Sequence, residues 1–557
     1  MLISEILHKT VESASLAAFK DKNFQKENLP NFIIEKPKNI AFGDYATSLP
    51  LQLAKTLDQN PIKIAEAINN AIPKLKEIEL CSVEPPGFLN FKLSQEWIEK
   101  QLLKVLKDKE KYGSKAEVSS KNIQVEFVSV NPTGRLHLGH MRGAIIGSTL
   151  SNVLQSQNYN VIREYYVNDA GNQMNNFGKS LLERMKEIKG DKFSLGENHY
   201  KGDDIKEIAL TIAKEFKDED LDSISKDLFS LITKRGMEIC IEMIKSDLSD
   251  LNIHHDNWFY ESSLIKSNYL DETLTKLKDS NLTYEKDGAL WIKTKELGDE
   301  RDNVLIKSID KKPTYFATDI AYHRNKFEER KFDEGIDVWG ADHHGHVKRM
   351  KLVLEKLGIE SSRLTVLLNQ IVSLKDIDGA ARFSKREGTS IFIKDLINEI
   401  GSDACRFSFL NRSSESQMEI DINIFRKKSS ENPVFYIQYA HARMSSILRS
   451  SIYFDISITD ADPNLLSTPG EIILIKKLLE YPELLNRVSY TLQVQELPAY
   501  ALELSQLIHK FYENNRVIDE DIKNIEMTKS RLLLVKASKI TLSNLLNLME
   551  MESPEKM

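Results

Sequence analysis

The segment His137-Leu138-Gly139-His140 carries side chains suited to phosphate chemistry. It follows a stretch with strand-like alternation and opens one with helical periodicity, the usual ligand position in an open α/β sheet. Residues three apart share a face of a helix, and the free N–H groups of a helix start attract phosphate. Two imidazoles could donate to the oxygens of a phosphorus centre, while Gly139 leaves room for a flat ring such as adenine. Taken alone, the motif fits two ordinary surface or core histidines equally well.

A second candidate is the basic segment 382–389, RFSKREGT, which places three positive charges within five residues. Arg382 and Lys385, with Ser384 between them, suit a mobile loop that closes over a polyphosphate. A solvated basic turn explains the same residues.

The segment ADHHGH at 341–346 raises the question of a metal site, because Asp and His are common metal ligands. Neighbouring side chains on a strand point in opposite directions, and no Asp-rich motif near an earlier strand completes a ligand set. We therefore expect no protein-bound metal.

These residues need a framework of strands and helices to hold them. The sequence predicts strands at 123–130 and 158–169 on either side of the helix that begins near His137, which is the start of a parallel βαβ unit. Further strand patterns occur at 288–293, 304–308, 335–340 and 364–372. The charged, helical span at about 180–280 is interpreted as an insertion. Amphipathic helical runs follow at 436–448, 471–487, 497–514 and 527–549 and predict a bundle.

The whole chain is expected to be an α/β protein with a doubly wound parallel sheet, a small N-terminal α/β domain and a C-terminal all-α bundle. We place the domains at 1–113, 114–424 and 425–557. The 557 residues, 41% hydrophobic and 29% charged with a net charge of −7, exclude collagen, a disulfide scaffold and a coiled-coil rod. The scattered cysteines, the lack of a signal peptide and the lack of a long apolar run predict a cytoplasmic protein.

The candidate motifs, taken with their flanks, resemble those of the arginyl-tRNA synthetases, members of the class I aminoacyl-tRNA synthetases. The pair of the HxGH segment and a KMSKS-like loop points to the class, although Arg382 and Phe383 replace its Lys and Met, and Arg135 stands where a small residue is common. The resemblance covers nearly the whole chain and rests on these segments: FGDYAT, PPGFLNFKL, VEFVSVNPTGRLHLGHMRGA, REYYVNDAGNQM, PTYFATDIAYH, VWGADHHGH, DACRFSFLNR, NPVFYIQYAHAR and SPEKM.

The resemblance implies a Rossmann-like catalytic domain and a two-step reaction. The arginine carboxylate attacks the α-phosphate of ATP to give arginyl-adenylate and pyrophosphate, and the 2′-OH of the terminal adenosine of the tRNA then accepts the arginyl group. By family position, His137 and His140 hold the α-phosphate region, with Lys385 as a third catalytic group. The implied ATP contacts are Gly139, Arg382, Ser384, Asp342 and His343. Mg²⁺ is expected to arrive with ATP.

The resemblance also implies the arginine pocket. Asp319 and Tyr315 would contact the guanidinium of the substrate. A carboxylate can accept two parallel hydrogen bonds from the planar guanidinium, which the ammonium group of lysine cannot offer. Glu126, Ser129 and Asn131 would contact the amino and carboxylate end. The alternatives are a solvent-facing strand carboxylate for Glu126 and a helix N-cap for Asp319.

The tRNA contacts are harder to predict, because the acidic balance of the chain does not indicate nucleic acid. Tyr436, Tyr439 and Arg443 are candidates in an anticodon-binding bundle, and Phe42 and Tyr45 are candidates in an N-terminal domain that touches the corner of the tRNA. A monomer is expected. The rival hypotheses are a nucleotidyltransferase that needs no tRNA and a catalytically silent tRNA-binding paralogue.

Overall fold

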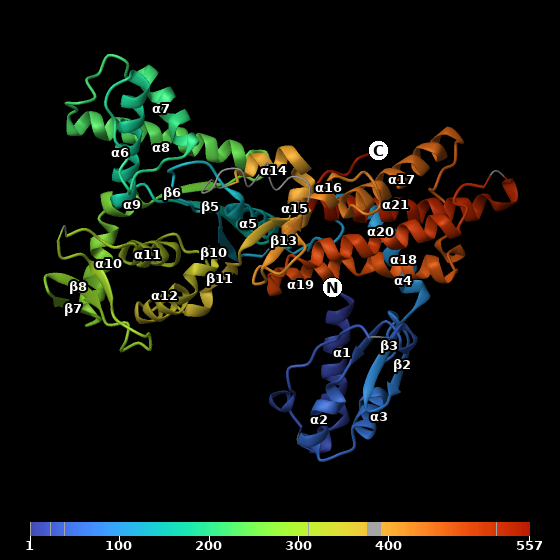
Figure 1. The fold of residues 1–557 in the computed structure, drawn as a ribbon. Coiled ribbons are helices and arrows are strands. Elements are labelled where there is room, and N and C mark those ends of the chain that lie inside the picture. Colours follow the sequence, from blue (N-terminus) through green and yellow to red (C-terminus); the bar gives the residue numbers. More distant parts are fainter. Residues whose placement is uncertain are drawn as a thin grey trace.

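The computed structural model describes residues 2–22, 24–37, 39–117, 119–309, 311–375, 391–519 and 521–557. Figure 1 shows three parts: a central α/β part with two lobes, a long helical bundle beside it, and a small N-terminal part beneath the bundle. Within the described residues, no helix has the length and apolar character that crossing a bilayer requires.

The central part is built on a five-stranded parallel sheet with the order β11-β10-β4-β5-β6. Helix α5 (Leu138–Ser156) connects β4 to β5 and is buried along most of its length. This arrangement confirms the predicted doubly wound parallel sheet. The strands are β4 (Asn122–Glu126), β5 (Asn160–Val167), β6 (Asn257–Tyr260), β10 (Glu334–Gly340) and β11 (Leu364–Asn369).

Two features of this sheet differ from the expectation. The first strand ends at Glu126 rather than at residue 130, because Val128 and Ser129 adopt left-handed φ angles of 71° and 44°, which no strand accommodates. Strand β6 lies inside the span that we expected to be a helical insertion. Its four residues are too short a run to stand out against the surrounding helical periodicity.

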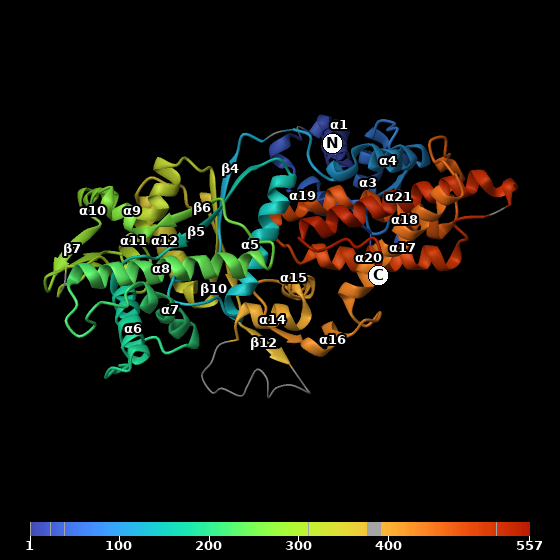
Figure 2. The ribbon, with the colours of Figure 1, turned by 90° about the horizontal axis from the view of Figure 1, so that it is seen from above.

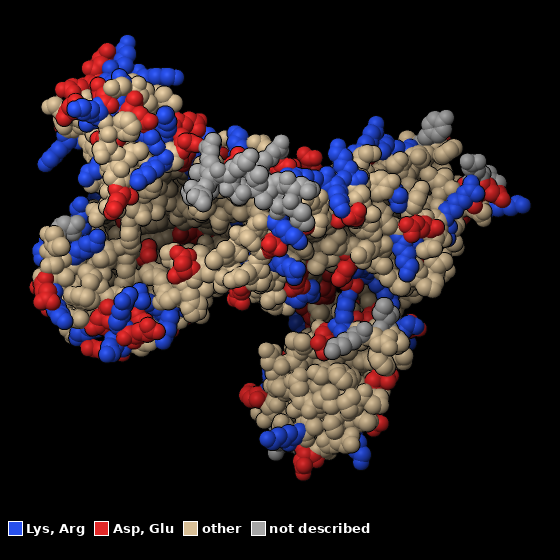
Figure 3. Space-filling view, in the orientation of Figure 1, with Lys and Arg blue, Asp and Glu red and all other residues tan. Residues whose placement is uncertain are grey.

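Two lobes extend from the sheet. Helices α6 (Gly171–Lys189), α7 (Asp203–Glu215) and α8 (Lys226–Ser249) form the first lobe. The second lobe contains α9 (Glu261–Lys266), α10 (Tyr269–Asp279), α11 (Tyr315–Arg324), α12 (His344–Lys356) and an antiparallel sheet of β7 (Thr283–Lys286), β8 (Ala289–Ile292) and β9 (Asn303–Ile306). The strands expected at 288–293 and 304–308 therefore exist but belong to this separate sheet. Figure 3 shows the surface hollowed between the lobes.

The C-terminal part is a bundle of long helices, seen from above in Figure 2. The run expected at 471–487 forms two helices rather than one, since Pro482 starts a new helix. The bundle contains α17 (Pro433–Tyr453), α18 (Pro469–Leu479), α19 (Tyr481–Thr491), α20 (Glu496–Asn514) and α21 (Ile525–Leu548). Short elements lead into it: β12 (Val372–Lys375), α14 (Ile393–Ile400), α15 (Ser402–Leu410), β13 (Met418–Asp421) and α16 (Ile422–Arg426).

Arg406 on α15 joins these parts. Its side chain is fully buried, forms an ion pair with Glu550 and donates to the carbonyls of Met549 and, at 2.6 Å, Leu251. Ser148 on α5 also donates to Glu550, at 2.6 Å. The Arg406 guanidinium is therefore the point where three segments meet: the end of the first lobe, helix α5 and the chain after the bundle.

The N-terminal part packs helices on an antiparallel sheet of order β1-β3-β2. It contacts the bundle through polar bonds, among them Asp44 with Lys476 at 2.6 Å and the Ser4 N–H with Glu483 at 3.0 Å. Its elements are α1 (Ile3–Ala18), β1 (Tyr45–Thr47), α2 (Leu49–Leu57), α3 (Pro61–Ala71), β2 (Ile78–Glu84) and β3 (Phe88–Leu93), with α4 (Gln95–Asp108) leading out of it.

Candidate active site

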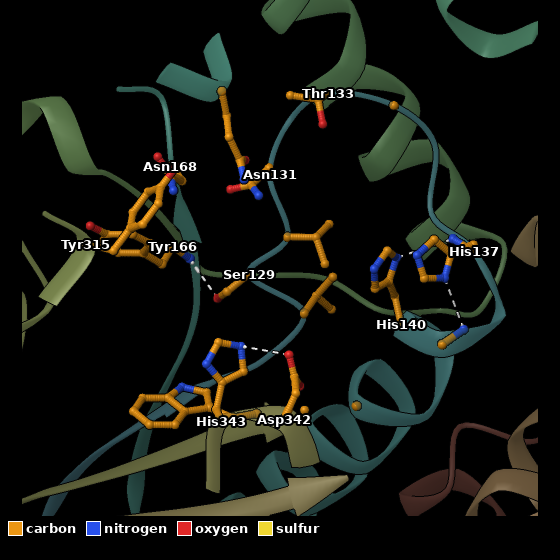
Figure 4. Close-up of a pocket in the computed structure, with 18 of the residues that line it drawn as sticks. Ser129, Asn131, Thr133, His137, His140, Tyr166, Asn168, Tyr315, Asp342 and His343 are labelled. Carbon is orange, nitrogen blue, oxygen red and sulfur yellow. Dashed lines mark hydrogen bonds and ion pairs between the residues drawn. The ribbon is translucent and has the colours of Figure 1, made fainter. Parts of the chain in front are cut away.

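A cavity of about 1330 Å³ opens at the carboxyl ends of β4, β5 and β10. The start of α5, helix α11 and the beginning of α7 complete its walls. In Figure 4, His137 and His140 lie at one end, Tyr166, Asn168 and Tyr315 lie at the other, and Ser129 lies between them. The cavity therefore brings the expected phosphate-binding and amino-acid-binding residues into one space, as ligand sites in parallel sheets require.

The two histidines are held by the first turn of α5. Nδ1 of His137 accepts the Gly139 N–H at 3.2 Å, and Nδ1 of His140 accepts the His137 N–H at 3.3 Å. An Nδ1 that accepts leaves the proton of a neutral imidazole on Nε2. Burial lowers the pKa of both rings, that of His140 to about 3 with a further contribution from His137. Both side chains are thus neutral Nε2–H donors at neutral pH.

Tyr315 and Asp319 lie four residues apart on α11 and both line the cavity. The helix is capped by Thr314, whose hydroxyl accepts from Ala317, so Asp319 is not an N-cap. Its Oδ2 lies 2.9 Å from Nε2 of His346. Among the described residues, no lysine or arginine pairs with this carboxylate, so its charge is open to a cationic ligand.

A second carboxylate, Glu261, stands near Asp319 at the start of α9 and is 5% exposed. Burial raises its pKa to about 7, with Asp319 and Asp169 adding to the rise and Tyr166 opposing it. A cation that binds near two such carboxylates favours the charged form of both and so lowers their pKa. The sequence reasoning missed Glu261, because only the fold of β6 and α9 brings it close to Asp319 and Tyr166, behind the residues that line the cavity.

Glu126 lies at the end of β4, where its carboxylate is buried rather than facing solvent. Its Oε2 accepts from Lys326 at 2.7 Å, and Lys326 also pairs with Asp337 at 2.7 Å. Burial works against the Lys326 charge, but the two carboxylates outweigh it and raise its pKa. Lys326 was not predicted, since a lysine in a polar helix normally faces water.

The turn after β4 carries Ser129 and Asn131, and both line the cavity. The Ser129 hydroxyl accepts the Tyr166 N–H at 3.1 Å and so ties the turn to β5. Two residues before Ser129, the Phe127 carbonyl contacts Nε2 of His255 at 3.3 Å. A β-branched residue at positive φ, such as Val128, is rare and indicates a turn held by its surroundings.

The remaining nucleotide candidates divide into two groups. Asp342 and His343 lie at the cavity wall, with the His343 ring 6.0 Å from that of Trp339. Gly139 also lines the cavity, in the first turn of α5. Arg382, Ser384 and Lys385 lie outside the described residues. The described part of the chain contains no group of three or more metal-ligating side chains.

The tRNA candidates lie outside the cavity. Arg443 on α17 stacks between the rings of Tyr439 and Tyr512, at 4.7 and 4.6 Å, and Tyr436 lies beside His509. His509 and Tyr512 belong to α20 and were not predicted, because their approach depends on how the bundle packs.

In the N-terminal part, Phe42 is 48% exposed and stays a candidate. Tyr45 is only 7% exposed and lies in the core, which corrects the expectation that it touches RNA. A tyrosine on a short strand gives no sequence signal of which face it occupies.

Comparisons with known proteins give three family matches that together span most of the chain. Residues 1–93 match the arginyl tRNA synthetase N terminal domain, residues 101–421 match the catalytic domain of tRNA synthetases class I (R), and residues 437–557 match the DALR anticodon binding domain. The chain is 41% identical over 553 residues to the arginine–tRNA ligase of Dehalococcoides mccartyi strain CBDB1, covering 99% of both chains. It is 38% identical to that of Listeria monocytogenes, covering 99% of this chain and 98% of the relative. The structure of the arginyl-tRNA synthetase of Thermus thermophilus superposes with a TM-score of 0.76 at 20% identity, over 100% of both chains.

Proposed function

The chain belongs to the arginyl-tRNA synthetase family, and from this premise we propose how its cavity works. The protein is an arginine–tRNA ligase that activates arginine with ATP and transfers it to the 2′-OH of the terminal adenosine of its tRNA. The observation that carries the assignment of the site is the single cavity that joins the paired histidines to the Asp319 carboxylate.

On the phosphate side, the Nε2–H groups of His137 and His140 would donate to the α-phosphate as the arginine carboxylate attacks it. As neutral donors they need no proton transfer, and they would stabilise the charge that develops as pyrophosphate leaves. Gly139, Asp342 and His343 would border the adenosine, while Arg382, Ser384 and Lys385 would contact the pyrophosphate end. Mg²⁺ would be held by the phosphates of ATP, where it supplies charge neutralisation.

On the arginine side, the guanidinium would pair with Asp319, with Tyr315 against its plane, and the nearby buried Glu261 would add negative charge behind them. Arginine would thereby lower the pKa of Glu261 from about 7, because a cation favours the charged carboxylate. Ser129 and Asn131 would contact the amino acid's other end. Glu126 would act there as part of its ion pair with Lys326 rather than as an isolated charge.

The tRNA would contact the aromatic face of α17 and α20, through Tyr436, Tyr439 and Arg443, and the N-terminal part near Phe42. The domain limits 1–113, 114–424 and 425–557 belong to this proposal, as do a monomeric state and a cytoplasmic location. No basic surface is required for stacking, since base–aromatic contacts do not depend on net charge.

Arginine-dependent ATP–pyrophosphate exchange, measured with and without arginine tRNA, tests the proposal. We expect exchange that requires arginine and, as in the family, tRNA. Exchange without tRNA would overturn the expected tRNA requirement. No exchange in either condition would favour the catalytically silent paralogue.

A further inference from the structure

The loop that joins β4 to the histidine helix is bound by carboxylates of the first lobe. The backbone N–H of Arg135 donates to Oδ2 of Asp204 at 3.0 Å. Its guanidinium reaches Oδ1 of Asp247 at 3.2 Å. Asp204 lies in the first turn of α7 and Asp247 in the last turn of α8, so two helices of the lobe hold one residue of the loop.

The surroundings of Asp204 and Asp247 show that this contact is built into the fold. A Cβ atom on Gly134 would lie 2.4 Å from Oδ2 of Asp204, so only glycine lets the carboxylate reach the next N–H. Asp247 has a side chain that is 1% exposed, and Arg135 is 20% exposed. A buried carboxylate of this kind depends on its cation partner.

The other side of the loop is anchored independently. The Leu138 N–H donates to the Ile391 carbonyl at 2.8 Å, and the Ile393 N–H donates to the Leu136 carbonyl at 3.1 Å. His137 therefore lies between two anchors: the backbone hydrogen bonds to residues 391–393 on one side and the carboxylates of the first lobe on the other. A shift of the lobe would act on the loop from one side only.

We propose that Arg135, Asp204 and Asp247 form a loop clamp through which the first lobe positions His137 for the activation step. Arg135 and Asp204 also line the cavity, but all three act as positioning residues, because their contacts hold the loop that carries His137. The inference rests on the proposed function. Through the loop clamp, the first lobe would affect the position of a catalytic side chain. The clamp also gives a physical role to Arg135, which stands where a small residue is common.

The test compares Asp204→Ala with Asp204→Asn in the exchange reaction. Alanine removes the acceptor of the Arg135 N–H, whereas the asparagine carbonyl oxygen keeps it. We expect kcat to fall about 100-fold for Asp204→Ala, the effect of misplacing a group by roughly 1 Å, with KM for arginine unchanged. Asp204→Asn should recover most of the loss. Gly134→Ala should reproduce the loss, because its methyl group displaces the same carboxylate.

The matched control is Arg235→Ala. Arg235 on α8 pairs with Glu215 on α7 at 2.9 Å and thus links the same two helices far from the loop. We expect it to keep the kcat of the parent protein. Equal kcat for Asp204→Ala, Gly134→Ala and Arg235→Ala would overturn the clamp. Absence of exchange in the parent protein would instead overturn the proposed function and the clamp's role with it.

Discussion

His346 and Asp319 are joined by a hydrogen bond of 2.9 Å between Nε2 and Oδ2. The imidazole is held in place by the rings of Phe316 and Trp339, with centroids at 5.3 and 5.5 Å. This bond fixes the orientation of the Asp319 carboxylate, so that its second oxygen, Oδ1, can accept a hydrogen bond from another donor. His346 of the ADHHGH segment thus orients the carboxylate that we propose binds the guanidinium.

Replacing Asp319 with asparagine should weaken arginine binding. The change keeps the shape and removes the charge, so one charge-assisted hydrogen bond becomes neutral, and KM for arginine should rise about 10- to 100-fold. KM for ATP should stay the same. Steady-state exchange kinetics at varied arginine measure this, with the exposed Asp287→Asn as the control. An unaltered dependence on arginine would remove Asp319 from the pocket.

His140→Ala should slow activation without weakening arginine binding. Loss of one donor aimed at a developing oxyanion costs about 10²- to 10³-fold in kcat. Single-turnover formation of arginyl-adenylate would report the chemical step directly. His199→Ala, in a loop of the first lobe, is the histidine control. A rate equal to that of the parent protein would mean that the histidine pair does not act on the phosphate.

His255 should make the fold less stable in acid. Burial lowers its pKa from 6.5 to about 3, against a raising contribution from the Phe127 carbonyl. Below pH 6.5 the unfolded imidazole takes up a proton that the folded one does not, so stability is lost as the pH falls. One histidine contributes about 1.4 kcal/mol for each pH unit below 6.5.

The measurement is the denaturant midpoint at pH 7.5 and pH 5.5, for the parent protein and for His255→Gln. The glutamine keeps a donor for the Phe127 carbonyl and does not titrate. We expect its stability to fall less steeply with acid, although His140 gives both proteins a common slope in the same direction. Parallel curves for the two proteins would contradict the assignment of a lowered pKa to His255.

Arg443→Ala should weaken tRNA binding alone. The change removes the cation that lies between the rings of Tyr439 and Tyr512 and holds them in place. Because these rings would then be less well oriented to stack on bases, KM for tRNA in aminoacylation should rise about tenfold. Arg487→Ala, which breaks an exposed pair with Glu496 in the same bundle, is the control. Equal KM values for the two variants would place the RNA contact elsewhere.

Local patterns in the sequence predicted the parallel sheet and the place of the histidine pair. The turn chemistry at 131–134 and the periodicity after it locate the start of α5 without knowledge of the fold. Tyr315 and Asp319 were expected in one pocket from the family resemblance alone, and α11 places them about one helical turn apart.

Glu261, Lys326 and the Asp204 carboxylate were not predictable in this way. Each is brought to its place by contacts between segments that are distant in sequence, and its own neighbours read as ordinary polar helix or turn. Tyr45 shows the converse problem, because one aromatic residue on a three-residue strand could face either core or solvent. Side-chain direction depends there on the sheet that forms around it.

The burial of Arg406 orders events during synthesis on the ribosome. Its partners Leu251, Met549 and Glu550 emerge at very different times, and the last two follow α21. Until Met549 and Glu550 emerge, Arg406 on α15 must remain hydrated, and so one side of α5 stays uncovered. Catalytic competence should therefore appear only after the final helix has left the exit tunnel.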